Sequence, residues 1–189
     1  MARRILIALT IAASSAHADP GWLTLGVTSE LQRYDATRGL RGEADLFDHH
    51  GWTAGVALAF AEGDIGVYDN AMTAVLATRD LNAIAYVART VAFEQWSLRI
   101  SFGAGAIRTS ASGDLMDLGS STPVAQTGVF GTLETSARAI VPISSRWAVT
   151  GGLVASYYGQ TFGFVGGTPD GATSRLGDVQ LILGLSTRL

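Results

Sequence analysis

Apolar and polar residues alternate along most of the chain after residue 20, and this period of two is typical of β-strands. The last segment, residues 178–189, shows the pattern most clearly. Its apolar face consists of Val179, Leu181, Leu183, Leu185 and Leu189. Its polar face consists of Asp178, Gln180, Gly184, Ser186 and Arg188. A helix would mix these two sets, so the segment is predicted to be a strand with one apolar face.

The same alternation predicts seven further strands. Five segments are clear: 22–34, 50–61, 96–107, 126–141 and 147–158. Residues 65–93 are expected to hold two more strands, about 66–77 and 82–93, with a tight turn near Arg79–Asp80; the Ala-rich stretch 70–81 also fits a helix. Long loops are expected at 35–49, 109–125 and 159–174, and short turns between most of the other strands. Eight strands with short turns on one side and longer loops on the other predict an all-β, antiparallel up-and-down transmembrane barrel.

The polar face of these strands carries charges interspersed with Gly, Ala, Ser and Thr. Small residues suit the crowded interior of a narrow barrel, whereas a solvated outer face more often carries long Lys and Glu. An Arg facing lipid near the bilayer midplane costs roughly 2–4 kcal/mol, which favours the same assignment. We therefore predict a polar network inside the barrel, formed by Glu30, Arg89, Arg99, Glu134, Arg138, Asp178 and Arg188.

Aromatic residues gather near the ends of the predicted strands. Trp and Tyr prefer the membrane interface because their rings are apolar and their tips polar. The predicted topology assigns Trp22, Phe60, Phe93, Trp96 and Trp147 to the periplasmic girdle. It assigns Tyr34, Trp52, Tyr157 and Tyr158 to the opposite girdle.

The N-terminal residues predict export. Arg3 and Arg4 precede an apolar run, and Ala16-His17-Ala18 has the small-x-small pattern of a cleavage site. We expect residues 1–18 to be a signal peptide, exported through the Sec pathway, and residues 19–189 to form one barrel domain. The chain has 13 Arg and no Lys against 16 acids, which gives no sign of a nucleic-acid surface. It has no Cys, which excludes disulfides and thiolate chemistry.

On this architecture the chain resembles the small OmpA/OmpX-type outer-membrane barrels, over residues 21–189. In that family the last strand usually has Gly six positions from its end and terminal aromatics. Gly184 and Leu189 fit these places, whereas Thr187 stands where an aromatic residue is usual. The resemblance implies location in the bacterial outer membrane, contact with its lipid including lipopolysaccharide, and insertion by the barrel-assembly machinery.

The resemblance also implies three classes of function: a structural or loop-mediated binding role, a lipid-modifying enzyme, or a narrow pore. Enzymes of this shape use a His-x-Ser pair on one strand face, which this chain lacks, since Gly51 and Trp52 follow two places after His49 and His50. Asp45, Asp48 and the two His residues on a predicted extracellular loop could form a catalytic or zinc site, but adjacent His side chains on a strand point oppositely. We predict no metal and no cofactor, and favour structure or binding over catalysis.

Overall fold

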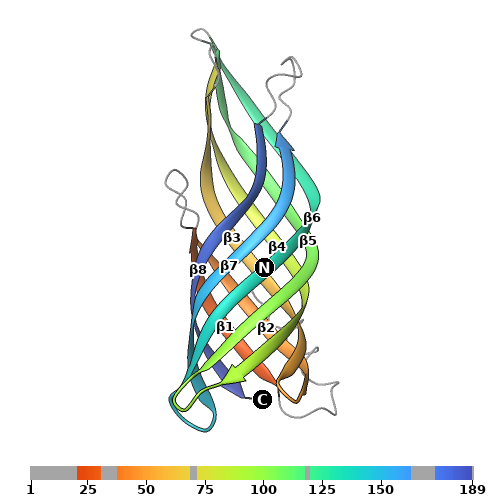
Figure 1. The fold of residues 1–189 in the computed structure, drawn as a ribbon. Helices are drawn as coiled ribbons and strands as arrows, with labels where there is room; N and C mark the ends of the chain where they lie inside the picture. Colours follow the sequence, from red (N-terminus) through yellow and green to blue (C-terminus); the bar gives the residue numbers. More distant parts are fainter. Residues whose placement is uncertain (1–20, 31–37, 69–71, 118–119, 163–172, 189) are drawn as a thin grey trace.

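The computed structural model describes residues 21–30, 38–68, 72–117, 120–162 and 173–188 (Figure 1). The predicted signal peptide, residues 1–18, lies outside the described residues. No helix in the described part of the chain is long and apolar enough to cross a membrane.

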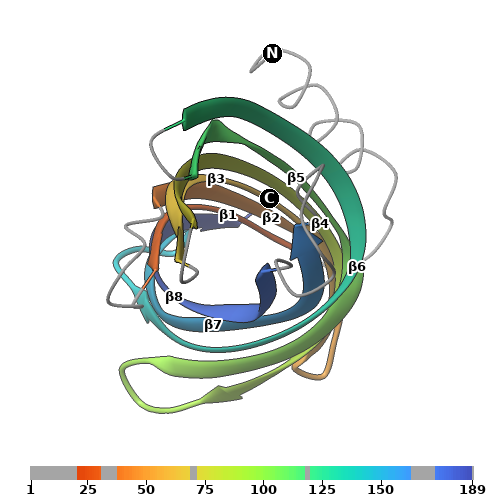
Figure 2. The same ribbon diagram turned by 90° about the horizontal axis from the view of Figure 1, so that it is seen from above.

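The described residues form eight strands that close into a barrel in sequence order, as Figure 2 shows from above. The strands are β1 (Trp22–Glu30), β2 (Arg38–His49), β3 (Trp52–Tyr68), β4 (Met72–Ala92), β5 (Ser97–Asp117), β6 (Ser120–Pro142), β7 (Trp147–Phe162) and β8 (Thr173–Arg188). Each strand pairs antiparallel with its neighbours, and β8 returns to β1. The predicted eight-stranded antiparallel barrel is therefore confirmed.

The first and last strands close the barrel along nine residue pairs, from Trp22 opposite Arg188 to Glu30 opposite Gln180. Gly26 lies directly opposite Gly184 in the middle of this seam. A Cβ on Gly184 would meet the Leu25 carbonyl oxygen at 2.6 Å, so the two backbones approach too closely there for a side chain.

Three of the predicted boundaries are wrong. Residues 35–49, predicted to be a loop, contain β2, whose inward face is charged and so lacks the usual apolar signal. The two strands predicted at 66–77 and 82–93 are largely one strand, β4, in which Arg79 points outward and Asp80 inward. Neighbouring residues of a strand point to opposite faces, so Arg79 and Asp80 lie within one continuous strand and not in the predicted turn. The predicted loop 109–125 consists mostly of the ends of β5 and β6.

The barrel is polar inside and apolar outside. Large apolar side chains on the outer wall are exposed; Leu40, Phe102 and Leu133 are each 62–63% accessible. Buried side chains are predominantly Thr, Ser, Asp, Glu and Arg, accompanied by a smaller apolar cluster around Ile84 and Tyr86. This inversion of a soluble protein's pattern is that of a barrel surrounded by lipid.

Tryptophans mark the end of the barrel at which β1 begins and β8 ends, called here the terminal end. Trp22 and Trp147 begin β1 and β7, and Trp96 directly precedes β5. Trp52 begins β3 at this same end, so the assignment of Trp52 to the opposite girdle is wrong. The reason is that β2, predicted to be a loop, crosses the barrel once more before Trp52.

The remaining aromatic residues divide between the two ends and the interior. Phe93 stacks on Trp96 at the terminal end, with ring centroids 4.5 Å apart. Phe60 was predicted at this end but lies eight residues along β3, opposite Leu40, toward the far end. Tyr157 also lies toward the far end and faces outward. Tyr158 is buried in the barrel instead, and Tyr34 lies outside the described residues.

Four strands continue beyond the rest of the barrel at the far end (Figure 1). Within the described residues, β3 pairs with β2 as far as Glu62, and β6 pairs with β7 from Thr132 onward. Beyond these points β3 to β6 remain paired with one another up to the β3–β4 and β5–β6 connections. They form a four-stranded protruding sheet, comprising 63–68, 72–78, 110–117 and 120–131.

Candidate functional site

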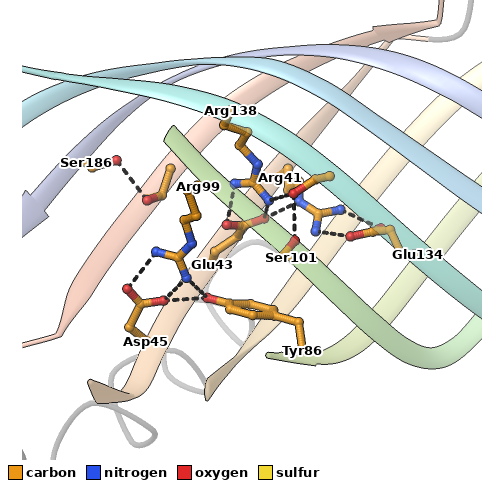
Figure 3. Close-up of polar contacts among 11 residues, drawn as sticks. Arg41, Glu43, Asp45, Tyr86, Arg99, Ser101, Glu134, Arg138 and Ser186 are labelled. Carbon is orange, nitrogen blue, oxygen red and sulfur yellow. Dashed lines mark hydrogen bonds and ion pairs between the residues drawn. The ribbon is translucent and has the colours of Figure 1, made fainter. Parts of the chain in front are cut away.

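Two features outside ordinary strand packing are candidates for function: the charged interior and the protruding sheet. The interior contains a chain of four charged side chains that crosses the lumen from β2 to β6 (Figure 3). The Arg41 guanidinium donates two hydrogen bonds to Glu134, at 2.9 and 2.5 Å, and one to Glu43 at 2.5 Å. Arg138 donates two to Glu43, at 2.5 and 2.6 Å. Strands that are not neighbours in the barrel are thereby tied together.

A second cluster lies closer to the terminal end. Arg99 on β5 donates hydrogen bonds of 2.9 and 2.6 Å to the Asp45 carboxylate on β2. The Tyr86 hydroxyl on β4 donates to the same carboxylate at 2.6 Å. The Arg99 guanidinium also lies 5.4 Å from the centre of the Tyr86 ring. Asp45 therefore joins three strands through two donors.

These ion pairs are buried in the barrel interior. All six charged members of the two clusters are at most 7% exposed, and each Arg makes a bidentate contact with a carboxylate. Bidentate geometry compensates best for the cost of removing charges from water. Between Arg41, Glu134 and Asp178 remains a cavity of about 20 Å³. That volume holds roughly one water molecule.

The structure brings together only part of the predicted polar network. Arg99, Glu134 and Arg138 lie in the two clusters, and Asp178 is buried, accepting a hydrogen bond of 2.7 Å from Gln180. Arg188 is exposed at the terminal end of β8, because the strand has left the lumen there. The side chain of Glu30 lies outside the described residues.

Arg89 was also assigned to the interior and is instead exposed on the outside. In β4 the even-numbered residues point inward, so an odd-numbered Arg points out. Its guanidinium donates to the backbone oxygen of His50 and lies 5.4 Å from the centre of the Trp52 ring.

The central members of the network, Arg41, Glu43 and Asp45, were missed because their segment was interpreted as a loop. A signal was present: three charges at every second position, separated by Gly42 and Ala44. Charged residues at every second position indicate a strand with a polar face, just as alternating apolar residues indicate a strand with an apolar face. Tyr86 was missed for a related reason, since the inward parity of β4 was not identified.

The two His residues do not form a site in this structure. His49 ends β2 and His50 lies in the tight turn before β3, with a positive φ of 51°. The turn is at the terminal end, so the prediction of a long loop at the opposite end is wrong. Their rings are 4.2 Å apart, and among the described residues no group of three His, Cys, Asp or Glu could hold a metal ion.

The tip of the protruding sheet is exposed on both faces along β6, whereas Leu76, Thr78 and Ala111 on the inward face of β4 and β5 are buried. Nearly every residue between Ser120 and Thr127 on β6 is exposed, whichever face it occupies. Within the described residues no strand pairs with the outer edge of β6 from Ser120 to Gly131. Pro123 lies on this edge, where its missing N–H group costs no ladder hydrogen bond. Among the described residues, the tip of β6 therefore offers exposed polar side chains on both faces and an edge that no strand pairs with.

Comparison with known proteins identifies the fold. No protein-family model matches the chain, and no curated protein matches it in sequence. A major outer membrane protein from Thermus thermophilus is similar in structure, with a TM-score of 0.61 and 15% identity over 92% of this chain and 100% of that one.

Two further solved structures cover nearly the whole chain at lower similarity. Neisserial surface protein A has a TM-score of 0.48 and 14% identity, covering 89% of this chain and 97% of that one. The attachment invasion locus protein of Yersinia pestis has a TM-score of 0.43 and 14% identity, covering 91% and 99%. On the strength of the Thermus match and the closed eight-stranded ring, the chain has the fold of outer-membrane β-barrel proteins.

Proposed function

We propose that this protein spans the outer membrane of a Gram-negative-type envelope as a plugged barrel, and binds a ligand outside the cell through its protruding sheet. The observation that carries the proposal is the contrast between a wall apolar on the outside and the tip of β6, where the mostly polar residues 120–127 are exposed on both faces. The apolar wall suits a lipid environment, and the exposed polar residues suit water.

The dimensions of the apolar wall support the membrane span. On β4 the outward residues from Val91 to Leu81, ten residues along the strand, are apolar apart from Arg89 near the terminal end. At about 3.3 Å per residue and a tilt of about 40°, this corresponds to roughly 25 Å along the barrel axis. Outer-membrane barrels have an apolar band of about that height. The protruding sheet begins where this band ends, at the row containing Glu62 and Arg79.

The interior argues against conduction as the main role. The buried ion pairs between β2 and β6 fill the cross-section, and the cavity beside them holds about one water. Catalysis has no such support among the described residues, where His49 and His50 lie in a turn at the terminal end. Ligand binding would use the protruding sheet, a feature that neither conduction nor catalysis explains.

The open edge of β6 suggests how a protein ligand would be held. An exposed edge presents backbone donors and acceptors to which an extended peptide can add as a further strand. Pro123 limits pairing at the tip, so the usable stretch lies between Val124 and Gly131. The Ser and Thr side chains on both faces supply further hydrogen bonds.

The orientation is tested by labelling with a membrane-impermeant maleimide, which the absence of native Cys makes specific. Ser121→Cys at the far end is expected to react on intact cells. Ser145→Cys, in the turn between β6 and β7, is expected to react only after lysis. Labelling of both or neither on intact cells contradicts the proposed topology.

The binding role is tested by shortening the protruding sheet. The register permits a deletion that includes the edge of β6, because Asp64 pairs with Ala77 and Ala106 with Gly131. Residues 65–76 and 107–130 are each replaced by Asn-Gly, which favours a two-residue hairpin turn. Cells expressing either form are compared for adherence to surfaces coated with serum proteins and to one another.

The shortened protein should keep the heat-modifiable gel migration of a folded barrel and its place in the outer-membrane fraction, while adherence falls to that of cells without the protein. Equal adherence of cells carrying the full-length and shortened forms would show that the sheet is not the binding element.

A further inference from the structure

We propose that the outer wall, at the upper boundary of the apolar band, holds the phosphate groups of an outer-leaflet glycolipid between Arg38, Arg79 and Arg108. The inference rests on the membrane span proposed above. It concerns the outside of the barrel, separate from the interior network, at a groove that borders the edge of β6 at Thr127.

Strand register brings the three arginines together. Arg38 on β2 lies opposite Glu62 on β3, which lies opposite Arg79 on β4. With neighbouring strands about 4.8 Å apart, the two Arg backbones are roughly 10 Å apart. Arg108 on β5 lies opposite Leu81, two residues from Arg79, which is a diagonal separation of about 7–8 Å. Because all three side chains are exposed on the outer face, their guanidinium groups can converge.

The row lies at the level where phosphates of a lipid are found. The outward residues one step closer to the membrane are apolar and exposed, including Leu40, Phe60 and Leu81. Acyl chains would lie against these residues, and the headgroup would lie just above them. Arg108 is flanked by Leu81 and Val129, so its long apolar stem covers lipid while its charge reaches the interface.

The charges of the row favour an anion. Three guanidinium groups lie beside two carboxylates, because Asp64 borders the same hollow as Glu62, and the bond from Arg79 to Glu62 is 3.0 Å long. That pair is highly exposed, at 74% for Arg79 and 53% for Glu62, so it contributes little and exchanges readily. Among the described residues no ion pair involves Arg38 or Arg108. Asp64, the next outward acid on β3, lies one step farther from the membrane. Guanidinium groups match phosphate oxygens in bidentate geometry.

The groove beside the row points to a sugar as the carrier of the phosphates. A hollow of about 740 Å³ is bordered by Arg38, Glu62 and Arg79 and also by the hydroxyl-bearing Ser110, Ser112 and Thr127. Its volume lies in the range of small-molecule sites. Hydroxyl side chains both donate and accept hydrogen bonds, as sugar hydroxyls require. From the membrane outward, the chain offers the apolar wall, then the arginine row, then the hydroxyl-lined groove. This is the order of acyl chain, phosphate and sugar in a phosphorylated glycolipid.

The test uses purified full-length protein in detergent and bisphosphorylated lipid A as the probe, with bound lipid counted by native mass spectrometry. Replacing the three residues together, Arg38→Gln, Arg79→Gln and Arg108→Gln, should weaken binding by about tenfold or more, because the phosphates lose their charged partners. Arg89→Gln removes an exposed Arg at the terminal end and should leave binding unchanged. Heat-modifiable migration verifies that each variant is folded.

Three further arms identify the source of the phosphate. Dephosphorylated lipid A should bind the unaltered protein as weakly as the triple variant binds the bisphosphorylated form. Phosphatidylglycerol, which lacks the glucosamine sugars, should bind weakly, and inorganic phosphate at equal concentration should not displace lipid A.

The proposal is overturned by equal binding to the triple variant, by equal binding of the dephosphorylated lipid, by equal binding of phosphatidylglycerol, or by displacement with inorganic phosphate. Since the measurement is made in detergent, it is independent of adherence and of cellular topology, so failure here leaves the proposed function standing. Conversely, unreactive Ser121→Cys on intact cells would contradict the topology without altering the detergent result.

Discussion

Glu43 is the residue whose replacement tests the interior network most directly. Its carboxylate accepts hydrogen bonds from both Arg41 and Arg138, and its side chain is 3% exposed. Glu43→Gln preserves the size of the side chain but leaves two buried guanidinium groups with one carboxylate, Glu134, between them. Removing one partner of a buried pair costs about 3–5 kcal/mol. The amide oxygen of Gln still accepts hydrogen bonds, so we expect a loss of about 3 kcal/mol, at the lower end of that range.

The assay is equilibrium unfolding in urea, with the barrel in lipid vesicles and the four tryptophans as the fluorescent probe. With a slope of about 1–3 kcal/mol per molar urea, the midpoint should fall by roughly 1–3 M. A quadruple variant, Arg41→Met, Glu43→Leu, Glu134→Leu and Arg138→Met, is the matched control. Replacing a whole buried ion network with apolar residues is often close to neutral, so it should unfold near the wild-type midpoint.

The two results together separate uncompensated charge from lost packing. If Glu43→Gln unfolds within about 0.5 kcal/mol of the wild type, the carboxylate is not supporting the two guanidinium groups and the account of the interior is refuted. If the quadruple variant loses more stability than the single one, packing volume outweighs charge balance.

Three further sets of substitutions test other parts of the fold. Phe102→Arg, about halfway up the apolar wall, should cost roughly 2–4 kcal/mol in vesicle unfolding, whereas Leu81→Arg at the upper boundary should cost at most about 1 kcal/mol; equal costs would contradict the membrane position. Gly105→Ala would drive a Cβ into a carbonyl oxygen of β4 and should reduce folding yield on gels, while Gly131→Ala, with nothing within 4 Å, should fold normally; equal yields would argue against the close approach. Tyr86→Phe removes one donor to a buried carboxylate and should lower unfolding free energy by about 1–3 kcal/mol, an effect absent if that hydroxyl bonds elsewhere.

Alternation could locate a strand only where the two faces meet different environments. β7 and β8 have apolar outer faces and polar inner ones, and both were predicted close to their positions. Between Ser120 and Gln126 most side chains on both faces are exposed, so little period-two contrast exists and the strand was interpreted as a loop. Hydrogen bonding along the sheet, which a hydrophobic pattern does not record, maintains the strand conformation there.

Which charged residues meet inside the barrel could be predicted only once the crossings were known. Arg99, Glu134 and Arg138 were identified from the polarity of well-defined strands. Arg41, Glu43 and Asp45 complete the same contacts but lie in the strand that was missed. The contacts join residues about 54–95 positions apart in sequence, and such pairing depends on the register of every intervening strand. The direction of the Arg89 side chain was predicted wrongly for the same reason.

The seam between β1 and β8 joins two strands that are not consecutive in the sequence, so its alignment depends on the strands themselves. A slip by one residue would exchange the inner and outer faces and is strongly disfavoured. A slip by two residues preserves the faces, and the facing glycines exclude it, because Gly26 would then meet Ile182 or Ser186 while Gly184 would meet Thr24 or Thr28. Gly184 thus fixes the register in which the ring closes. β8, the last strand of this barrel, carries the residue that aligns it with β1.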